Sequence, residues 1–237
     1  MSPSLLSKLT AEFVGTAFLL AGVVGSGIMA ESLTDDVGLQ LFQNAFATGA
    51  VLVALILALA PASGAHFNPA VTLADRIFGG LDTRTAVAYV AAQITGGVVG
   101  VIAANLMFGL SAVDWSTKDR SGGHLVFGEA IATAGLLLVI FGVVRSGREL
   151  TAAFSVGGYI AAAYYFTSST SFANPAVTIA RTLSDTFAGI EPASAPPFVA
   201  AQIGATVIAA WVIKVIYPAS TAESTESVDA AAPTDSF

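Results

Sequence analysis

The pentapeptide Asn-Pro-Ala-Val-Thr occurs twice in this 237-residue chain, at residues 68–72 and 174–178. Each copy follows a run of small residues and precedes a short helical pattern. Asn is a strong helix N-cap, and Pro is favoured in the first helical turn, where its missing N–H would be unpaired anyway. The two boxes, Asn68-Pro69-Ala70 and Asn174-Pro175-Ala176, therefore predict two helix starts whose asparagine amides can also donate hydrogen bonds.

A second pair of polar residues lies inside apolar sequence. Glu12-x-x-x-Thr16 and Glu129-x-x-x-Thr133 follow the same pattern, each before an apolar run. A carboxylate at membrane depth is costly and is a functional candidate by default. Such a pair could couple transport to protons or could accept hydrogen bonds that hold loops, and its symmetric duplication favours the second role.

Enzymatic chemistry is not indicated by these residues. The chain has no cysteine, which excludes disulfides and thiolate catalysis, and only two histidines. The pattern requires no nucleophile, acid–base pair or metal cluster, so no catalytic residue, metal ligand or cofactor is expected. The net charge of −7 argues against nucleic acid as a partner.

The composition places these residues in a membrane. The chain is 55% hydrophobic and 11% charged, against roughly 25% charged residues in soluble domains. Six apolar stretches are long enough to cross a hydrocarbon core: 9–30, 39–65, 85–108, 125–144, 151–167 and 196–217. They are too continuous for the alternating strands of a membrane barrel, so an all-α membrane protein is predicted.

The chain repeats itself in halves of about 1–110 and 120–217, which also share the tetrapeptide Ala-Ala-Gln-Ile. Three spans per half is an odd number, so the second half enters the membrane inverted, and inverted repeats place a polar site near the midplane. The helices that start at the boxes, about 69–78 and 175–187, are long enough for only about half of a membrane. We expect them to meet by their N-termini, with loops 63–67 and 168–173 lining a water-filled path.

The distribution of basic residues predicts the orientation. With a cytoplasmic N-terminus, six lysines and arginines lie near the inner side and three near the outer side, which favours this orientation and a cytoplasmic C-terminus. Residues 1–217 are expected to form one channel domain. The acidic segment 218–237, rich in Ser, Thr, Ala and Pro, is expected to be a disordered tail.

The paired boxes, the Glu-x-x-x-Thr patterns and the segment Ser-Gly-Ala-His-Phe-Asn-Pro-Ala-Val-Thr resemble the major intrinsic proteins, the aquaporin and aquaglyceroporin family. The resemblance implies six transmembrane helices and two re-entrant half-helices. It also implies passive conduction, a homotetramer in the plasma or inner membrane, and no cofactor. It makes Glu12 and Glu129 acceptors that brace the re-entrant loops, and it makes His66 a pore-lining residue on the cytoplasmic side.

One position departs from the family pattern. The residue after the second box is usually Arg, and here it is Val177. By the family's spacing the other constriction positions fall on Thr48, Ala162 and Ser171, none of which is aromatic. The resemblance then implies a wide constriction that passes water and larger neutral solutes such as glycerol, urea and arsenous acid. Arg181, one turn beyond Val177, could act as a vestibule charge or pair with Asp185.

Three other functions remain open from the sequence. An ion-coupled secondary transporter also uses inverted repeats and broken helices. A water-selective channel would have the same fold with a narrower constriction. A membrane adhesion protein would need a large extracellular surface, and the predicted outer loops are short.

Overall fold

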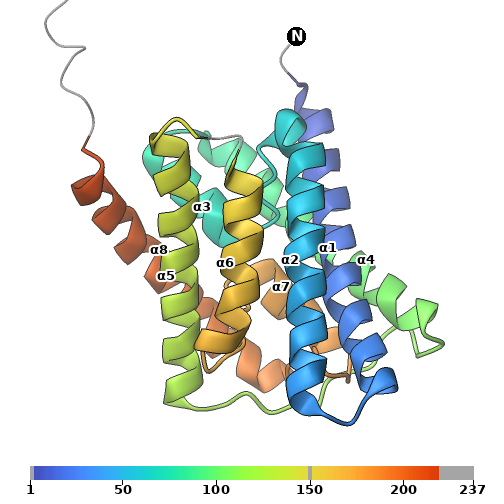
Figure 1. Cartoon of the computed structure of the whole chain (residues 1–237). Helices are drawn as coiled ribbons and strands as arrows, with labels where there is room; N and C mark the ends of the chain where they lie inside the picture. The colour runs from blue at the N-terminus through green and yellow to red at the C-terminus, as the bar shows by residue number, and fades with distance from the viewer. Residues whose placement is uncertain (1–2, 149–150, 219–237) are drawn as a thin grey trace, which may run out of the picture.

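The computed structural model describes residues 3–148 and 151–218. The described residues form a bundle of helices and contain no strand (Figure 1). The long helices are α1 (Leu5–Leu33), α2 (Val37–Ser63), α4 (Thr83–Met107), α5 (Gly123–Arg145), α6 (Ala152–Phe166) and α8 (Ala195–Ile216), and the two short ones are α3 (Pro69–Phe78) and α7 (Pro175–Ala180). The predicted all-α fold is confirmed.

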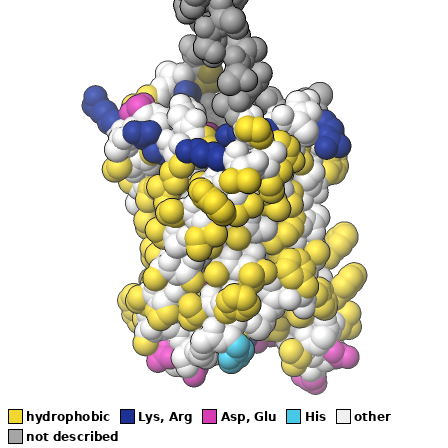
Figure 2. Space-filling view, turned by 90° about the vertical axis from the view of Figure 1, so that its left-hand side faces the viewer, with side chains coloured by type: hydrophobic (Ala, Val, Ile, Leu, Met, Phe, Trp, Pro, Cys, Tyr) yellow, Lys and Arg dark blue, Asp and Glu magenta, His cyan; other side chains and the backbone are white. Residues whose placement is uncertain are grey.

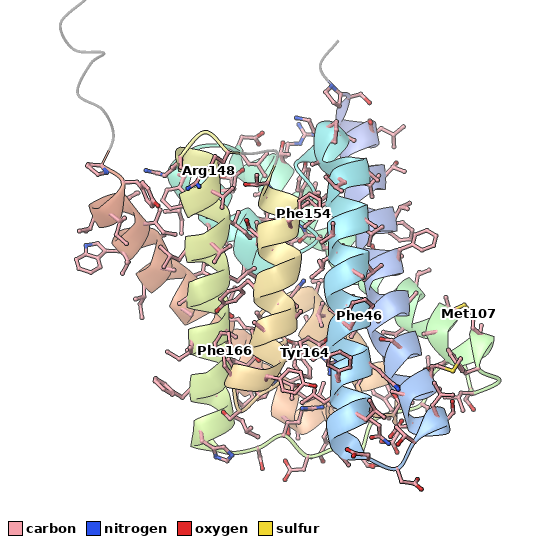
Figure 3. All side chains as sticks on the ribbon, viewed as in Figure 1. Phe46, Met107, Arg148, Phe154, Tyr164 and Phe166 are labelled. Carbon is pink, nitrogen blue, oxygen red and sulfur yellow. The ribbon has the colours of Figure 1, made fainter. Side chains whose placement is uncertain are left out.

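Five segments, which contain α1, α2, α4, α5 and α8, are long and apolar enough to cross a membrane. The sixth predicted span, α6, has 15 residues and rises only about 22 Å at 1.5 Å per residue. The face shown in Figure 2 carries a broad hydrophobic belt, with Lys and Arg gathered at one edge and most of the visible acidic residues at the other. Phe46, Phe154 and Phe166 project from this surface, each more than half exposed (Figure 3).

Glycines let the helices of the bundle approach backbone to backbone. A Cβ atom at Gly96 or Gly100 of α4 would collide with the backbone carbonyls of Phe13 and Ala17 in α1. On α2 and α6, a Cβ at Gly49 would lie 2.9 Å from the carbonyl oxygen of Gly157. The α1–α4 and α2–α6 crossings therefore both depend on residues without side chains.

The two short helices start at the boxes. Oδ1 of Asn68 accepts a hydrogen bond from the N–H of Ala70 (2.8 Å), and Oδ1 of Asn174 accepts one from Ala176 (3.0 Å). Figure 1 shows α3 in the upper part of the bundle and α7 in the lower part. The two half-helices thus approach the centre from opposite ends.

The second short helix ends earlier than predicted. We expected it to run to about residue 187, but α7 ends at Ala180 and one 3-10 turn, Arg181–Leu183, follows. The carbonyls of Thr182 and Leu183 accept hydrogen bonds from the backbone N–H groups of Ser116 and Asp114. These two residues belong to the linker, the segment 108–122 that connects α4 to α5. These carbonyls are therefore bonded to the linker, and the chain leaves the helical path.

Candidate pore

The asparagines of the two boxes cross-link the two re-entrant loops. Nδ2 of Asn68 donates to the carbonyl oxygen of Ala173 (2.8 Å), and Nδ2 of Asn174 donates to that of Phe67 (2.8 Å). Each asparagine thus caps its own half-helix through Oδ1 and holds the opposite loop through Nδ2. The N-termini of α3 and α7, with their partial positive charges, meet at this point.

The first loop is bonded to a buried carboxylate on α1. Glu12 is fully buried and accepts hydrogen bonds from the backbone N–H groups of His66 (3.0 Å) and Phe67 (2.7 Å). It also accepts from Oγ of Ser63 (2.6 Å) and Nε2 of Gln93 (2.7 Å). Each of the two carboxylate oxygens therefore accepts two hydrogen bonds from within the protein.

The second loop repeats the arrangement on α5. Glu129, also fully buried, accepts hydrogen bonds from the N–H groups of Phe172 and Ala173, both at 2.8 Å. Nε2 of Gln202 donates to Glu129 (2.6 Å) and to Oγ1 of Thr178 (2.9 Å). Each glutamate is therefore bound to the two residues that directly precede a box asparagine.

Both loops adopt a backbone conformation that side chains disfavour. Among the described residues, the five non-glycine residues with positive φ all lie in them: Ala65, Phe67, Thr170, Ser171 and Ala173. Such conformations cost on the order of 1–3 kcal/mol each and persist only where the surroundings enforce them. The two carboxylates, which bind the N–H groups of Phe67 and Ala173, help to enforce them.

A cavity of about 370 Å³ runs past both boxes. Asn68 and Asn174 line it, and so does His66, whose Nδ1 lies 3.1 Å from Oγ1 of Thr72 and whose Nε2 lies 3.9 Å from a carboxylate oxygen of Asp75. Much of the remaining wall is aliphatic, from α1, α2, α5 and α6: Leu19, Val23, Leu52, Ile56, Leu136, Ile140, Val156 and Ile160.

The structure places three of the four expected constriction residues at this cavity. Thr48, Ser171 and Val177 line it and are nearly inaccessible from outside. Ala162 does not line it and lies exposed on the outer side of α6, so its assignment was wrong. The α6 residues that line the cavity are spaced four apart: Ala152, Val156, Ile160 and Tyr164. Ala162 is two residues from Ile160 and Tyr164, about 200° around the helix from each.

Tyr164 is a cavity residue that the sequence reading missed. Its ring is buried, and its hydroxyl lies 3.1 Å from Oγ1 of Thr48. Figure 3 shows Tyr164 near the end of α6, beside α2. An aromatic residue therefore lies beside Thr48, one of the expected constriction positions, although none of the four expected positions is itself aromatic. The sequence held no signal for it, because the cavity residues at the same four-residue spacing, Val156 and Ile160, are as apolar as residues that face lipid.

Arg181 also lines the cavity, with only 2% of its surface exposed. Its Nε donates to the carbonyl of Ala188, and its guanidinium carbon lies 3.5 Å from the centroid of the Phe172 ring. The alternative of a pair with Asp185 is not observed, because Asp185 accepts hydrogen bonds from Thr117 instead.

The linker brings two more cations to the same end of the molecule. Arg120 lies 5.0 Å from the Phe172 ring centroid, and Lys118 donates to the carbonyl of Phe187 (2.8 Å). Burial, followed by the repulsion from Arg120, lowers the pKa of Lys118 to about 8. Three basic side chains thus lie against the Phe172 and Phe187 rings, and of these Arg181 also lines the cavity.

Comparisons with known proteins agree with this geometry. The family model described as major intrinsic protein matches residues 1–153. The chain is 48% identical to the aquaglyceroporin AqpS of Rhizobium meliloti (strain 1021), over 86% of this chain and 88% of that protein. It is 30% identical to aquaporin Z of Brucella melitensis biotype 1, over 60% of this chain and 67% of that protein. The X-ray structure of the aquaglyceroporin from Plasmodium falciparum superposes with a TM-score of 0.72 at 24% identity, covering 91% of this chain and 98% of that one, which shows the shared fold.

Proposed function

Because this chain belongs to the major intrinsic protein family, whose members are passive membrane channels for water and small uncharged solutes and not enzymes, we propose that its pore passes solutes larger than water. Glycerol, urea and neutral metalloid hydroxides such as arsenous acid are the candidates. Water passes through the same path.

The observation that carries this proposal is the lining of the cavity next to the second box. Val177, directly after that box, contributes an aliphatic side chain, where an arginine would contribute a long charged one. The neighbouring wall is largely aliphatic, with donors and acceptors only at a few points. Such a surface suits solutes that present both hydroxyl groups and carbon edges.

The centre of the pore favours the passage of neutral solutes over the passage of cations. The N-termini of α3 and α7 each carry about half a positive charge, which raises the energy of a cation between them. The amides of Asn68 and Asn174 line the cavity and are donors, so they orient the oxygen of a passing solute. Glu12 and Glu129 lie behind the loops with their oxygens already hydrogen-bonded. The carboxylate that does line the cavity, that of Asp75, lies beside His66.

The residues proposed to carry conduction follow from this geometry. Asn68, Pro69, Ala70, Asn174, Pro175 and Ala176 form the central boxes, Thr48, Ser171 and Val177 contribute to the constriction, and Glu12 and Glu129 hold the loops. His66 lines the pore on the other side of the boxes from the constriction. Residues 1–217 act as one channel domain built from the halves 1–110 and 120–217.

The protein is proposed to lie in the plasma or inner membrane with its N-terminus in the cytoplasm. On the face shown in Figure 2, the Lys and Arg side chains gather at the edge of the hydrophobic belt on the side where α1 begins (Figures 1 and 2), and positive residues favour the cytoplasmic side. The resemblance to the family supports a homotetramer with one pore in each subunit. The acidic tail, nearly all of which lies outside the described residues, is assigned no role.

The test is purified protein in liposomes, with shrinking and reswelling followed by light scattering for water, glycerol, urea and arsenous acid. We expect water and at least one larger solute to pass with a low activation energy and without an imposed ion gradient. Passage of water alone would make the protein a water-selective channel. Solute flux that requires a proton or sodium gradient would make it a secondary transporter.

A further inference from the structure

The guanidinium group of Arg181 is fixed on one side and unpartnered on the other. The Phe172 ring lies against it and its Nε is bonded to Ala188, yet within residues 3–148 and 151–218 its two terminal nitrogens have no hydrogen-bond or ion-pair partner. A buried cation without a partner is strongly unfavourable. Because Arg181 lines the cavity, water or a solute in the lumen is the available partner for those nitrogens.

The loop after α7 and the linker hold this arginine in place. Three successive backbone carbonyls, those of Phe187, Ala188 and Gly189, accept hydrogen bonds from Lys118, Arg181 and Arg120 respectively. The N–H of Phe187 donates to the carboxylate of Glu31 at the end of α1 (2.8 Å). The loop is thus hydrogen-bonded both to the linker and to α1, and Arg181 donates to the middle one of its three carbonyls, that of Ala188.

Arg120 contacts the same support as Arg181. It lies over the Phe172 ring as well, and its Nε donates to the carbonyl of Gly189 (2.8 Å). The ring is itself fixed, because the N–H of Phe172 donates to Glu129 and its edge packs against Phe198. The linker between the two halves therefore reaches the residue on which Arg181 is stacked.

We infer that Arg181 is the cationic selectivity residue of this pore, supplied one helical turn beyond Val177, and that Arg120 of the linker positions it through Phe172 and the loop carbonyls. Together with the hydroxyls of Thr48 and Tyr164, it supplies the few donors of an otherwise largely aliphatic wall. The pore favours neutral solutes with adjacent oxygen acceptors, such as polyols, over donor-rich solutes such as urea, and it rejects cations. The solute preference rests on the proposed function, and the cation rejection does not.

The experiment compares liposomes that contain equal amounts of wild-type protein, Arg181→Met, Arg181→Lys, Arg120→Gln and Arg120→Lys. Arg84→Gln, which removes an exposed arginine on the opposite membrane face by the proposed orientation, is the matched control. Fluxes of water, glycerol and urea are measured by light scattering. Leaks of protons and potassium are measured with an entrapped pH dye and with a voltage-sensitive dye.

We expect Arg181→Met to lower the glycerol-to-urea flux ratio several-fold and to raise the cation leak, while Arg84→Gln changes neither. Arg181→Lys keeps the charge but loses the planar fork of donors, so it should retain cation rejection with a lowered ratio. Arg120→Gln should also lower the glycerol-to-urea flux ratio, by less than Arg181→Met does. Arg120→Lys should give a ratio between those of Arg120→Gln and the wild type. A merely structural role for Arg120 would lower all fluxes equally and leave the ratio unchanged.

An Arg181→Met protein that reaches the membrane with wild-type ratio and leak overturns the inference. If that variant does not fold, Arg181→Lys decides, since an unchanged ratio there has the same consequence. Wild-type protein that passes water but neither larger solute would end the proposed function, and the cation leak of the Arg181 variants would still test the role of the charge.

Discussion

Asn68 and Ala173 lie 105 positions apart in the chain, and the side-chain amide of the first donates a 2.8 Å hydrogen bond to the backbone carbonyl of the second. Asn174 and Phe67 form the reciprocal bond. An amide nitrogen carries two protons, so one remains on each asparagine for the lumen that both residues line. The same two side chains thus join the halves of the protein and, in the proposed function, present donors to a passing solute.

Replacing Asn174 with Asp tests this double role. The carboxylate can still cap α7, but it cannot donate to the carbonyl of Phe67, and it adds negative charge where two positive helix ends meet. We expect solute flux to fall or cation leak to rise, measured in liposomes with a voltage-sensitive dye. Asn44→Asp is the matched control, because Asn44 is buried on α2, bonds to Val23 and does not line the cavity. Unchanged flux and no leak in Asn174→Asp would remove the second box from the conduction path.

Replacing Glu129 with Gln tests the support of the second loop. A glutamine has one acceptor oxygen, so the N–H of Phe172 or of Ala173 would face an amide nitrogen that is itself a donor. A buried donor left without a partner costs about 1–3 kcal/mol. We expect a lower thermal unfolding temperature in detergent, followed by circular dichroism, and no change for the control Glu191→Gln, whose side chain is only half-buried.

The same variant separates bracing from proton coupling. If Glu129 only holds the loop, the remaining flux of Glu129→Gln should be as insensitive to an imposed pH gradient as that of the wild type. A wild-type flux that follows the pH gradient and is uncoupled by the substitution would instead make Glu129 a transport carboxylate.

The support of the loops could be predicted because its residues are polar in apolar surroundings. Glu12 and Glu129 stand out in the sequence for that reason, and the boxes carry their own capping signal. The strained backbone of Phe67 and Ala173 could not be predicted, since neither residue type favours positive φ and both are held by the hydrogen bonds that they donate to carboxylates on other helices. The early end of α7 also depends on bonds to the distant linker.

The face of α6 that lines the pore was assigned wrongly for a different physical reason. Lipid on one side and an aliphatic pore wall on the other both favour apolar residues, so the helix has no polar stripe that marks its inner face. Counting back from the box then selected Ala162, while the chain places Ile160 and Tyr164 at the cavity. A single pair of large substitutions distinguishes the two faces.

Ile160→Phe and Ala162→Phe form that pair on one helix. Ile160 is 6% exposed and lines the cavity, so a larger ring there should obstruct it and lower glycerol flux several-fold. Ala162 lies on the outer surface, where a phenylalanine contacts lipid and should leave the flux unchanged. Light scattering at equal protein content measures both, and the reverse result would restore Ala162 to the pore.

The pKa of Lys118 gives a prediction for the linker. Burial and the charge of Arg120 lower this pKa to about 8, against about 10.4 for an unperturbed lysine. Between these two values the unfolded chain binds a proton that the folded chain does not, so this group makes the folded state more stable as the pH rises from 8 to 10.4. The midpoint can be measured by NMR on ¹³C-methylated lysines, with Lys118→Arg for assignment. A midpoint near 10 would mean that the ammonium group is not held against Phe187.

Val177→Arg tests the constriction beside the second box. An arginine there would extend a long stem and a charged planar head into the part of the cavity that Thr48 and Ser171 line, narrowing it and adding donors. The new cation would also lie one helical turn from Arg181, which strengthens the rejection of cations. Water is small enough to pass a narrower opening, so water flux should survive, whereas glycerol and arsenous acid must displace the guanidinium or its water. We expect a clear fall in the glycerol-to-water flux ratio at equal protein in the membrane.

Val177→Leu, which adds volume without charge, is the control and should lower the ratio less. If the ratio of a folded Val177→Arg protein equals that of the wild type, Val177 does not limit solute passage and the selectivity lies with Arg181 and Tyr164 alone.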